Sequence, residues 1–132
     1  MKLKLHTDGG SRGNPGLAAI GGVLFNDRDE IVGQFSKFIG TTTNNVAEYT
    51  ALVEGLTLAQ TKGATEVACY LDSELVVKQL NGQYKVKDQN MKLLYAEVIK
   101  KVEMFNFVTF KHVPREQNEN ADALVNNALD SL

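Results

Sequence analysis

The sequence predicts an α/β fold in which a five-stranded mixed sheet is flanked by helices. Apolar and polar residues alternate along the first third of the chain, as they do in strands, and the spacing then changes to a helical period. Further apolar strands alternate with helical segments, which gives the order βββαβααβα. No repeat, linker or low-complexity tract divides the 132 residues, so we expect one domain spanning residues 1–132.

The first half of the chain contains three strands and a helix. The strands are predicted over residues 2–8, 17–26 and 30–40, with a hairpin turn over residues 26–30. A helix is predicted within residues 41–63, and Gly63 is a typical C-terminal stop. The apolar face of this helix consists of Val46, Ala47, Ala51, Leu52, Gly55, Leu56 and Ala59.

The second half alternates strands with helices. Strands are predicted over residues 66–72 and 107–114, and helices over residues 73–82, 88–105 and 118–132. Asn81 and Gly82 close the first of these helices, and Pro114 breaks the last strand. Because strand–helix–strand connections join parallel strands, the later strands should run parallel to the first.

The composition narrows the class of protein. Hydrophobic residues make up 43% of the chain and charged residues 23%, as in ordinary globular proteins. The single cysteine, Cys69, lies in an apolar run, which favours a small buried side chain over a reactive thiol, and without clustered Cys and His no structural zinc site is expected. Without a leader or a long apolar run, a cytoplasmic location without membrane contact is expected. A net charge of −2 makes any nucleic-acid role depend on local charge or bound cations.

Four acidic residues fall at one edge of the predicted sheet. Asp8 ends the first strand and Asp72 ends the fourth, and parallel neighbours expose such residues at their carboxyl edge. Glu48 lies one turn into the first helix and Asp122 near the start of the last. Taken singly, Asp8 is explained as a turn residue, Asp72 as a helix cap, and Glu48 and Asp122 as ordinary helix acids.

Those separate explanations do not account for the convergence of the four carboxylates. Four such groups at one edge repel one another unless a positive charge lies between them. Carboxylate ligands without histidine or cysteine suit hard cations such as Mg²⁺ or Mn²⁺. Two such ions about 4 Å apart can hold the attacking and leaving oxygens of a phosphodiester. The pattern therefore predicts metal-assisted phosphoryl chemistry.

The chain resembles type 1 ribonuclease H in four segments, which occur in family order: TDGGSRGNPG, TTTNNVAEYTAL, YLDSELVVKQLNG and HVPREQNENADALVNNAL. The resemblance covers nearly the whole chain and implies the ribonuclease H-like fold. It also implies that Asp8, Glu48, Asp72 and Asp122 bind two Mg²⁺ or Mn²⁺ ions. The implied activity is hydrolysis of the RNA strand of RNA/DNA hybrids by a metal-activated water, which leaves 5′-phosphate and 3′-hydroxyl ends.

The resemblance also indicates positions that contact nucleic acid. In a glycine-rich turn after Asp8, backbone groups can approach the minor groove and reach the 2′-hydroxyl that distinguishes RNA. The candidate substrate contacts are Gly9, Gly10, Ser11, Asn14, Thr43, Asn44 and Asn45. Asn14 is equally explained as a turn residue and Asn44 as a helix cap, whereas binding is favoured for Asn45.

One departure from the family pattern concerns the grip on the substrate. Many members carry a basic, tryptophan-containing handle after the second helix, and residues 81–92 lack it. The chain therefore resembles a short form of the family, and weaker, less salt-dependent binding is expected. Lys85 and Lys87 are candidate phosphate contacts, or simply solvated charges.

A second departure concerns proton transfer. Many members place a histidine on a flexible loop before the last acid, and this chain has little room for such a loop. Arg115 is assigned to phosphate or leaving-group stabilisation, because a guanidinium keeps its proton. His112 is a weaker catalytic candidate, Asn118 a candidate auxiliary metal or water contact, and His6 an ordinary strand residue.

The complete set of four acids favours an active, hybrid-specific endoribonuclease. A nuclease that also cuts double-stranded RNA is an open alternative, because both duplexes are A-like and carry 2′-hydroxyls. A hybrid-binding module that does not cleave is disfavoured, since no acid is missing and little basic surface is present. We expect a free-standing monomer, because no heptad pattern calls for a partner helix.

Overall fold

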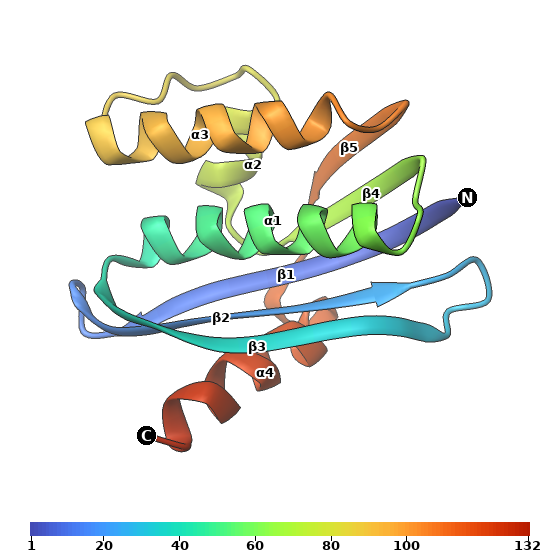
Figure 1. Ribbon diagram of the computed structural model, residues 1–132. Coiled ribbons are helices and arrows are strands. Elements are labelled where there is room, and N and C mark those ends of the chain that lie inside the picture. Colours follow the sequence, from blue (N-terminus) through green and yellow to red (C-terminus); the bar gives the residue numbers. More distant parts are fainter.

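Five strands form one mixed sheet in the computed structural model, which describes residues 1–132 (Figure 1). The strands are β1 (Lys2–Arg12), β2 (Gly16–Phe25), β3 (Ile31–Thr42), β4 (Glu66–Leu71) and β5 (Phe107–His112). They lie in the order β3-β2-β1-β4-β5. Strands β1, β2 and β3 pair antiparallel, whereas β4 runs parallel to β1 and to β5, which confirms the predicted mixed sheet.

Helices cover both faces of the sheet (Figure 1). They are α1 (Asn44–Thr61), α2 (Glu74–Leu80), α3 (Gln89–Val102) and α4 (Glu119–Asp130). Helices α1, α2 and α3 lie on one side, and α4 packs alone on the other, against β1, β2 and β3. The predicted order βββαβααβα is confirmed, with one addition: a short 3₁₀ turn over Arg115–Gln117 follows Pro114. No helix combines the length and the apolar character needed to cross a membrane.

The first strand is longer than the sequence predicts, and this corrects the expected glycine-rich turn. Antiparallel pairing with β2 continues past Asp8, which lies opposite Gly21, as far as Arg12 opposite Leu17. The glycines do not stop the ladder, because they keep the backbone donors and acceptors that β2 requires. The turn is confined to residues 13–15 and begins where Gly13 takes a φ of +92°.

The different ends of β1 and β4 create the edge where the acids lie. Parallel pairing of these strands stops at His6 and Tyr70, while β1 runs on beside β2 alone. Asp8 therefore lies on β1 just beyond the residues that pair with β4. Asp72 follows Leu71, the last residue of β4. Both residues reach the same carboxyl edge, as predicted.

Three apolar clusters of unequal size hold the layers together. On the α1 side, 17 buried residues form one cluster that includes Leu5, Leu52, Leu56 and Val98, and four more buried residues form a second. The apolar face predicted for the first helix is confirmed, since Ala47, Leu52 and the other members except Val46 are buried. On the α4 side, the cluster has three buried residues, namely Ala19, Val125 and Leu129.

Candidate active site

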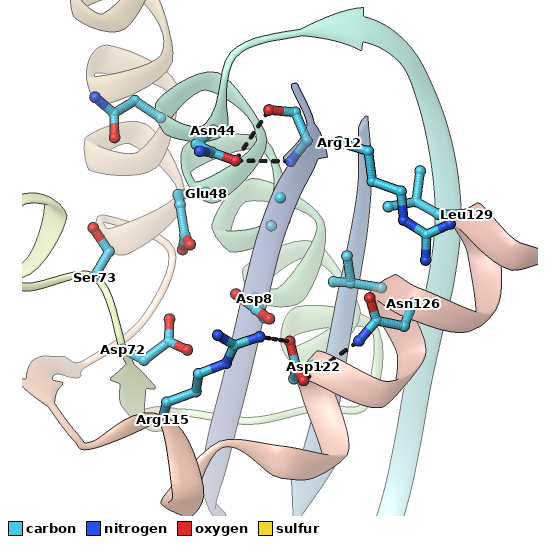
Figure 2. Close-up of a pocket in the computed structure, with 15 residues that line it drawn as sticks. Asp8, Arg12, Asn44, Glu48, Asp72, Ser73, Arg115, Asp122, Asn126 and Leu129 are labelled. Atoms are coloured by element: carbon cyan, nitrogen blue, oxygen red, sulfur yellow. Dashed lines mark hydrogen bonds and ion pairs between the residues drawn. The ribbon is translucent and has the colours of Figure 1, made fainter. Parts of the chain in front are cut away.

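Four acidic side chains from four elements face one pocket (Figure 2). Asp8 projects from β1, Glu48 from α1, Asp72 from the end of β4 and Asp122 from the first turn of α4. One carboxylate oxygen from each of Asp8, Glu48 and Asp72 lies within 4.8 Å of the others. Asp122 approaches Asp8 from the opposite layer, so the predicted convergence of the four acids is what the structure displays.

Glycines let both helices come close enough to present these acids. A Cβ on Gly9 would collide with the backbone carbonyl group of Ala47, next to Glu48. A Cβ on Gly21, which pairs with Asp8, would lie 2.6 Å from the carbonyl oxygen of Ala121, next to Asp122. Each acid-bearing helix therefore packs directly on a strand backbone at the residue beside its acid.

Burial makes the negative charges of this site unfavourable in the protein alone. Asp8 is 7% exposed and Glu48 is 8% exposed. Burial, with the nearby charge of Asp72, raises the pKa of Asp8 to about 7. Burial and the neighbouring Asp8 raise the pKa of Glu48 well above its usual range, and burial also raises the pKa of Asp72. These carboxylates would be stabilised by a positive charge placed among them.

One buried oxygen atom indicates where a positive charge would bind. The Glu48 Oε2 atom is buried and has no hydrogen-bond partner. The one cationic group that pairs with the cluster is the Arg115 guanidinium, which lies 3.5 Å from Asp122 Oδ1. That side chain is 76% exposed, so it sits at the rim and leaves the buried oxygens uncompensated. An all-oxygen donor set of this kind fits a hard divalent cation.

The pocket around the acids is open and polar. It has a volume of about 530 Å³, and Val125 and Leu129 are its two apolar lining residues. The polar part of the lining also includes Gly9, Gly10, Ser11, Asn44 and Asn45. A polar, open site with clustered acids fits a large polar substrate better than a small apolar ligand.

Comparison with known proteins identifies the family. A family model described as "Reverse transcriptase-like" matches residues 6–128. The structure of RNase H1 from the archaeon Halobacterium salinarum superimposes with a TM-score of 0.98 at 39% identity, and all of both chains is covered. The chain belongs to the type 1 ribonuclease H family.

Two further structures show the same relationship. The N-terminal RNase H domain of Rv2228c from Mycobacterium tuberculosis gives a TM-score of 0.96 at 41% identity, covering 98% of this chain and 100% of that one. LC11-RNase H1, solved in complex with an RNA/DNA hybrid, gives 0.94 at 42% identity, covering 98% and 97%. Some curated relatives are longer: the chain spans 36% of the bifunctional protein Rv2228c and 65% of the Halobacterium ribonuclease HI.

In this family member, three of the predicted substrate positions, Ser11, Asn14 and Asn44, form a hydrogen-bonded group at the start of α1. Asn44 Oδ1 accepts hydrogen bonds from the Ser11 backbone N–H at 2.8 Å and the Ser11 hydroxyl at 3.0 Å. Asn14 Oδ1 accepts from the Asn44 backbone N–H at 3.1 Å. Thr43, and not Asn44, caps α1, because its hydroxyl accepts from the Val46 N–H. The side chain of Asn45 is exposed and makes no hydrogen bond within the protein.

The alternative explanation of Asp72 as a helix cap is wrong. Ser73 caps α2, since its hydroxyl accepts a hydrogen bond from the Val76 N–H at 3.3 Å. Asp72 is thereby left free to face the other acids.

Asn126 is a site residue that the sequence analysis missed: its amide donates to Asp122 Oδ2 at 3.4 Å. The signal was present, because residues four apart on a helix share one face.

The remaining candidate site residues differ in whether they line the pocket. Arg115 lines the pocket, whereas His112 is exposed at the end of β5 and is not part of the lining. Lys85 and Lys87 are exposed in the segment between α2 and α3 and form no ion pair. Asn118 is buried outside the pocket lining, and its amide donates to the Thr7 carbonyl at 2.8 Å.

Proposed function

We propose that residues 1–132 form a single catalytic domain, an endoribonuclease that hydrolyses the RNA strand of RNA/DNA hybrids. The observation that carries this proposal is the convergence of four carboxylates around a buried, unpartnered oxygen of Glu48. Membership in the type 1 ribonuclease H family supports the reaction. The hybrid bound in the LC11-RNase H1 structure, 42% identical to this chain, supports the substrate.

Asp8, Glu48, Asp72 and Asp122 would hold two divalent cations, Mg²⁺ or Mn²⁺. The fit rests on three features: the donors are all oxygens, two of the acids are buried, and Glu48 Oε2 lacks a partner. Bound cations of this kind polarise a phosphate and lower the pKa of a water that attacks it. If the P–O3′ bond breaks and the 3′ oxygen leaves, the products would be a 5′-phosphate and a 3′-hydroxyl.

Arg115 and Asn126 act on the side of Asp122. Their donors lie 3.5 Å and 3.4 Å from the two carboxylate oxygens of Asp122, so they orient that side chain toward the pocket. The exposed Arg115 guanidinium also offers donors to a phosphate at the rim of the site. Because a guanidinium stays protonated, Arg115 stabilises charge and does not transfer a proton. His112, outside the pocket lining, is the weaker candidate for that transfer.

Substrate recognition would fall to the polar edge beside Glu48. The proposed contacts with the nucleic acid are the backbone of Gly9 and the residues Gly10, Ser11, Asn14, Thr43, Asn44 and Asn45. The Asn45 amide, free of partners in the protein, has the donor and the acceptor that a 2′-hydroxyl needs. Lys85 and Lys87 would add phosphate contacts from the segment after α2. We propose that the domain works as a monomer.

The test is cleavage of one labelled RNA strand presented free, in duplex RNA, and paired with DNA. Each substrate is incubated with EDTA, Mg²⁺ or Mn²⁺, using the wild-type protein and Asp8→Asn. The expected result is cleavage of the hybrid that requires a metal and falls by several orders of magnitude in Asp8→Asn. Lys2→Gln, a change on the same strand far from the pocket, is the control and should cut as the wild type does.

The other outcomes separate the alternatives. Cleavage of duplex RNA as well would mean that this short form does not discriminate between A-like duplexes. Binding of the hybrid without cleavage under any metal would overturn the enzymatic proposal in favour of a binding module. Full activity in Asp8→Asn would show that the site is misassigned.

A further inference from the structure

Asn118 occupies the N-cap position of α4, yet its side chain does not cap the helix. Asparagine at this position normally accepts a hydrogen bond from the first turn of its own helix. Here the residue is 1% exposed, and its Nδ2 atom donates to the backbone carbonyl of Thr7 at 2.8 Å. The side chain therefore connects α4 to β1.

Both ends of this connection lie next to site acids. Thr7 immediately precedes Asp8 on β1. The backbone carbonyl of Asn118 accepts a hydrogen bond from the Asp122 N–H at 3.1 Å, the first helical bond of α4. Asn118 thus connects the two layers. Its side chain bonds to the residue before Asp8, and its backbone carbonyl bonds to the N–H of Asp122.

His6 holds the other side of the Asn118 amide. A carbonyl only accepts hydrogen bonds, so the amide NH₂ faces Thr7 and the Oδ1 atom faces the His6 ring. His6 Nδ1 lies 3.2 Å from that oxygen and must carry the proton that it donates. The ring is fixed in turn, since it stacks on Tyr70 at a centroid distance of 4.9 Å and meets the edge of Phe25 at 5.5 Å.

We infer that Asn118, held by His6, is a positioning residue that sets the place of Asp122 relative to Asp8. The apolar cluster between α4 and the sheet has three buried residues, so directional polar contacts contribute to fixing the start of this helix. The inference rests on the proposed function, because it assigns Asn118 to the same metal-binding site without contact to substrate. It replaces the expected direct metal or water contact of Asn118.

The first test compares Asn118→Asp with Asn120→Asp. The first variant keeps the shape of Asn118 but loses the donor to Thr7, whereas Asn120 is exposed on the same helix and receives the same charge change. In Asn118→Asp we expect kcat on the hybrid to fall roughly 10-fold and Mn²⁺ affinity, measured by calorimetry without substrate, to fall similarly. KM for the hybrid should stay within about two-fold, because no substrate contact is removed. Asn120→Asp should match the wild type.

The second test separates the His6 hydrogen bond from its packing. His6→Asn places an amide donor where Nδ1 lies but loses the stacked ring, and His6→Phe keeps the ring but loses the donor. We expect His6→Phe to lower kcat and Mn²⁺ affinity roughly five-fold, the equivalent of one lost hydrogen bond. His6→Asn should retain more of both, even where its melting temperature is the lower of the two.

A purely structural role would give another pattern. If Asn118→Asp and His6→Phe lowered only the melting temperature and kept the wild-type Mn²⁺ affinity and kcat, the inference would be overturned. Better Mn²⁺ binding in His6→Phe than in His6→Asn would also contradict it. A wild-type protein that binds Mn²⁺ but cuts no hybrid would refute the proposed function alone, because the Mn²⁺ affinities of the variants still test the positioning.

Discussion

The two faces of the sheet hold their acids in different ways. Helix α1 carries Glu48 above 17 clustered buried residues, whereas α4 carries Asp122 above a cluster of three. The attachment of α4 depends more on polar contacts: Asn118 to Thr7, the Ser36 hydroxyl to the Leu124 carbonyl at 2.6 Å, and Arg12 to Asp130 at 2.6 Å. One half of the site is therefore held mainly by apolar burial, and the other half relies more on directional polar contacts.

The largest expected effect comes from matched truncations in the two cores. Leucine-to-alanine changes in cores remove about 2–5 kcal/mol from the free energy of unfolding. We expect Leu52→Ala, on the fully buried face of α1, to fall at the upper end of this range and Leu129→Ala, 6% exposed on the inner face of α4, at the lower end. Urea unfolding of both variants measures the difference, and equal losses would contradict the comparison.

Adding one methyl group at each close approach gives the next largest effect. Gly9→Ala presses against the backbone of α1, and Gly21→Ala against the backbone of α4. Overpacking costs about 1–3 kcal/mol, and occasionally more. Because α1 packs on the larger apolar cluster, Gly9→Ala should lose more stability. Gly21→Ala should lose less, since α4 packs on a cluster of three buried residues, but should lower kcat by displacing Asp122. Melting curves and hybrid cleavage test this, and a stability loss in Gly21→Ala equal to that in Gly9→Ala would argue against a weaker attachment of α4.

A smaller expected effect is the pH dependence of the free energy of unfolding, to which the two halves of the site should contribute unequally. The pKa of Asp8 is about 7 in the folded protein, against a usual value of 3.8, so the folded state binds more protons between those pH values. Without metal, the free energy of unfolding should therefore fall as the pH rises from about 4 to about 7. Added Mg²⁺ should reverse the loss at neutral pH, because a ligand of the folded state stabilises it.

Variants of the acids locate the source of that pH dependence. Glu48→Gln removes a buried charge from the α1 side and should flatten the pH dependence of the melting temperature most clearly. Asp122→Asn removes a charge that is 29% exposed and already paired with Arg115, so it should change the slope less. Thermal melts across pH in EDTA provide the measurement, and an identical slope in Glu48→Gln and the wild type would count against the assignment.

The smallest expected effect lies at the end of α4. The ion pair of Arg12 with Asp130 joins side chains that are 50% and 65% exposed, and such pairs contribute about 0–1 kcal/mol. Asp130→Ala should therefore change the free energy of unfolding by less than about 1 kcal/mol. Urea unfolding at low and high salt tests this. A larger loss would mean that the end of α4 is held by charge more firmly than its exposure indicates.

Most of the fold followed from the sequence, because it depends on local patterns. Hydrophobic periodicity located every strand and helix, and parallel crossovers placed Asp8 and Asp72 at one edge. The 3₁₀ turn at Arg115 and the extension of β1 through the glycines did not follow. The extension depends on a partner strand, whereas the glycines by themselves are typical of a turn.

The parts of the site that were not predicted depend on residues far apart in the chain. An asparagine before a helix has the same sequence signature whether it caps that helix or reaches another layer. Asn44 meets Ser11 across 33 positions and Asn118 meets Thr7 across 111. No local pattern contains these pairings, so only the folded arrangement distinguishes a cap at Thr43 from the contacts of Asn44.

The place of Asp122 in the chain bears on when during biosynthesis the proposed active site is complete. Asp8, Glu48 and Asp72 are translated early, whereas Asp122 and the Asn118 contact come 50 and 46 residues after Asp72. Contacts between distant segments form late in folding, since a long loop must close first. A nascent chain with β1 to β4 already paired thus has three of its acids and lacks the fourth. We expect activity to emerge only after α4 has docked on the sheet.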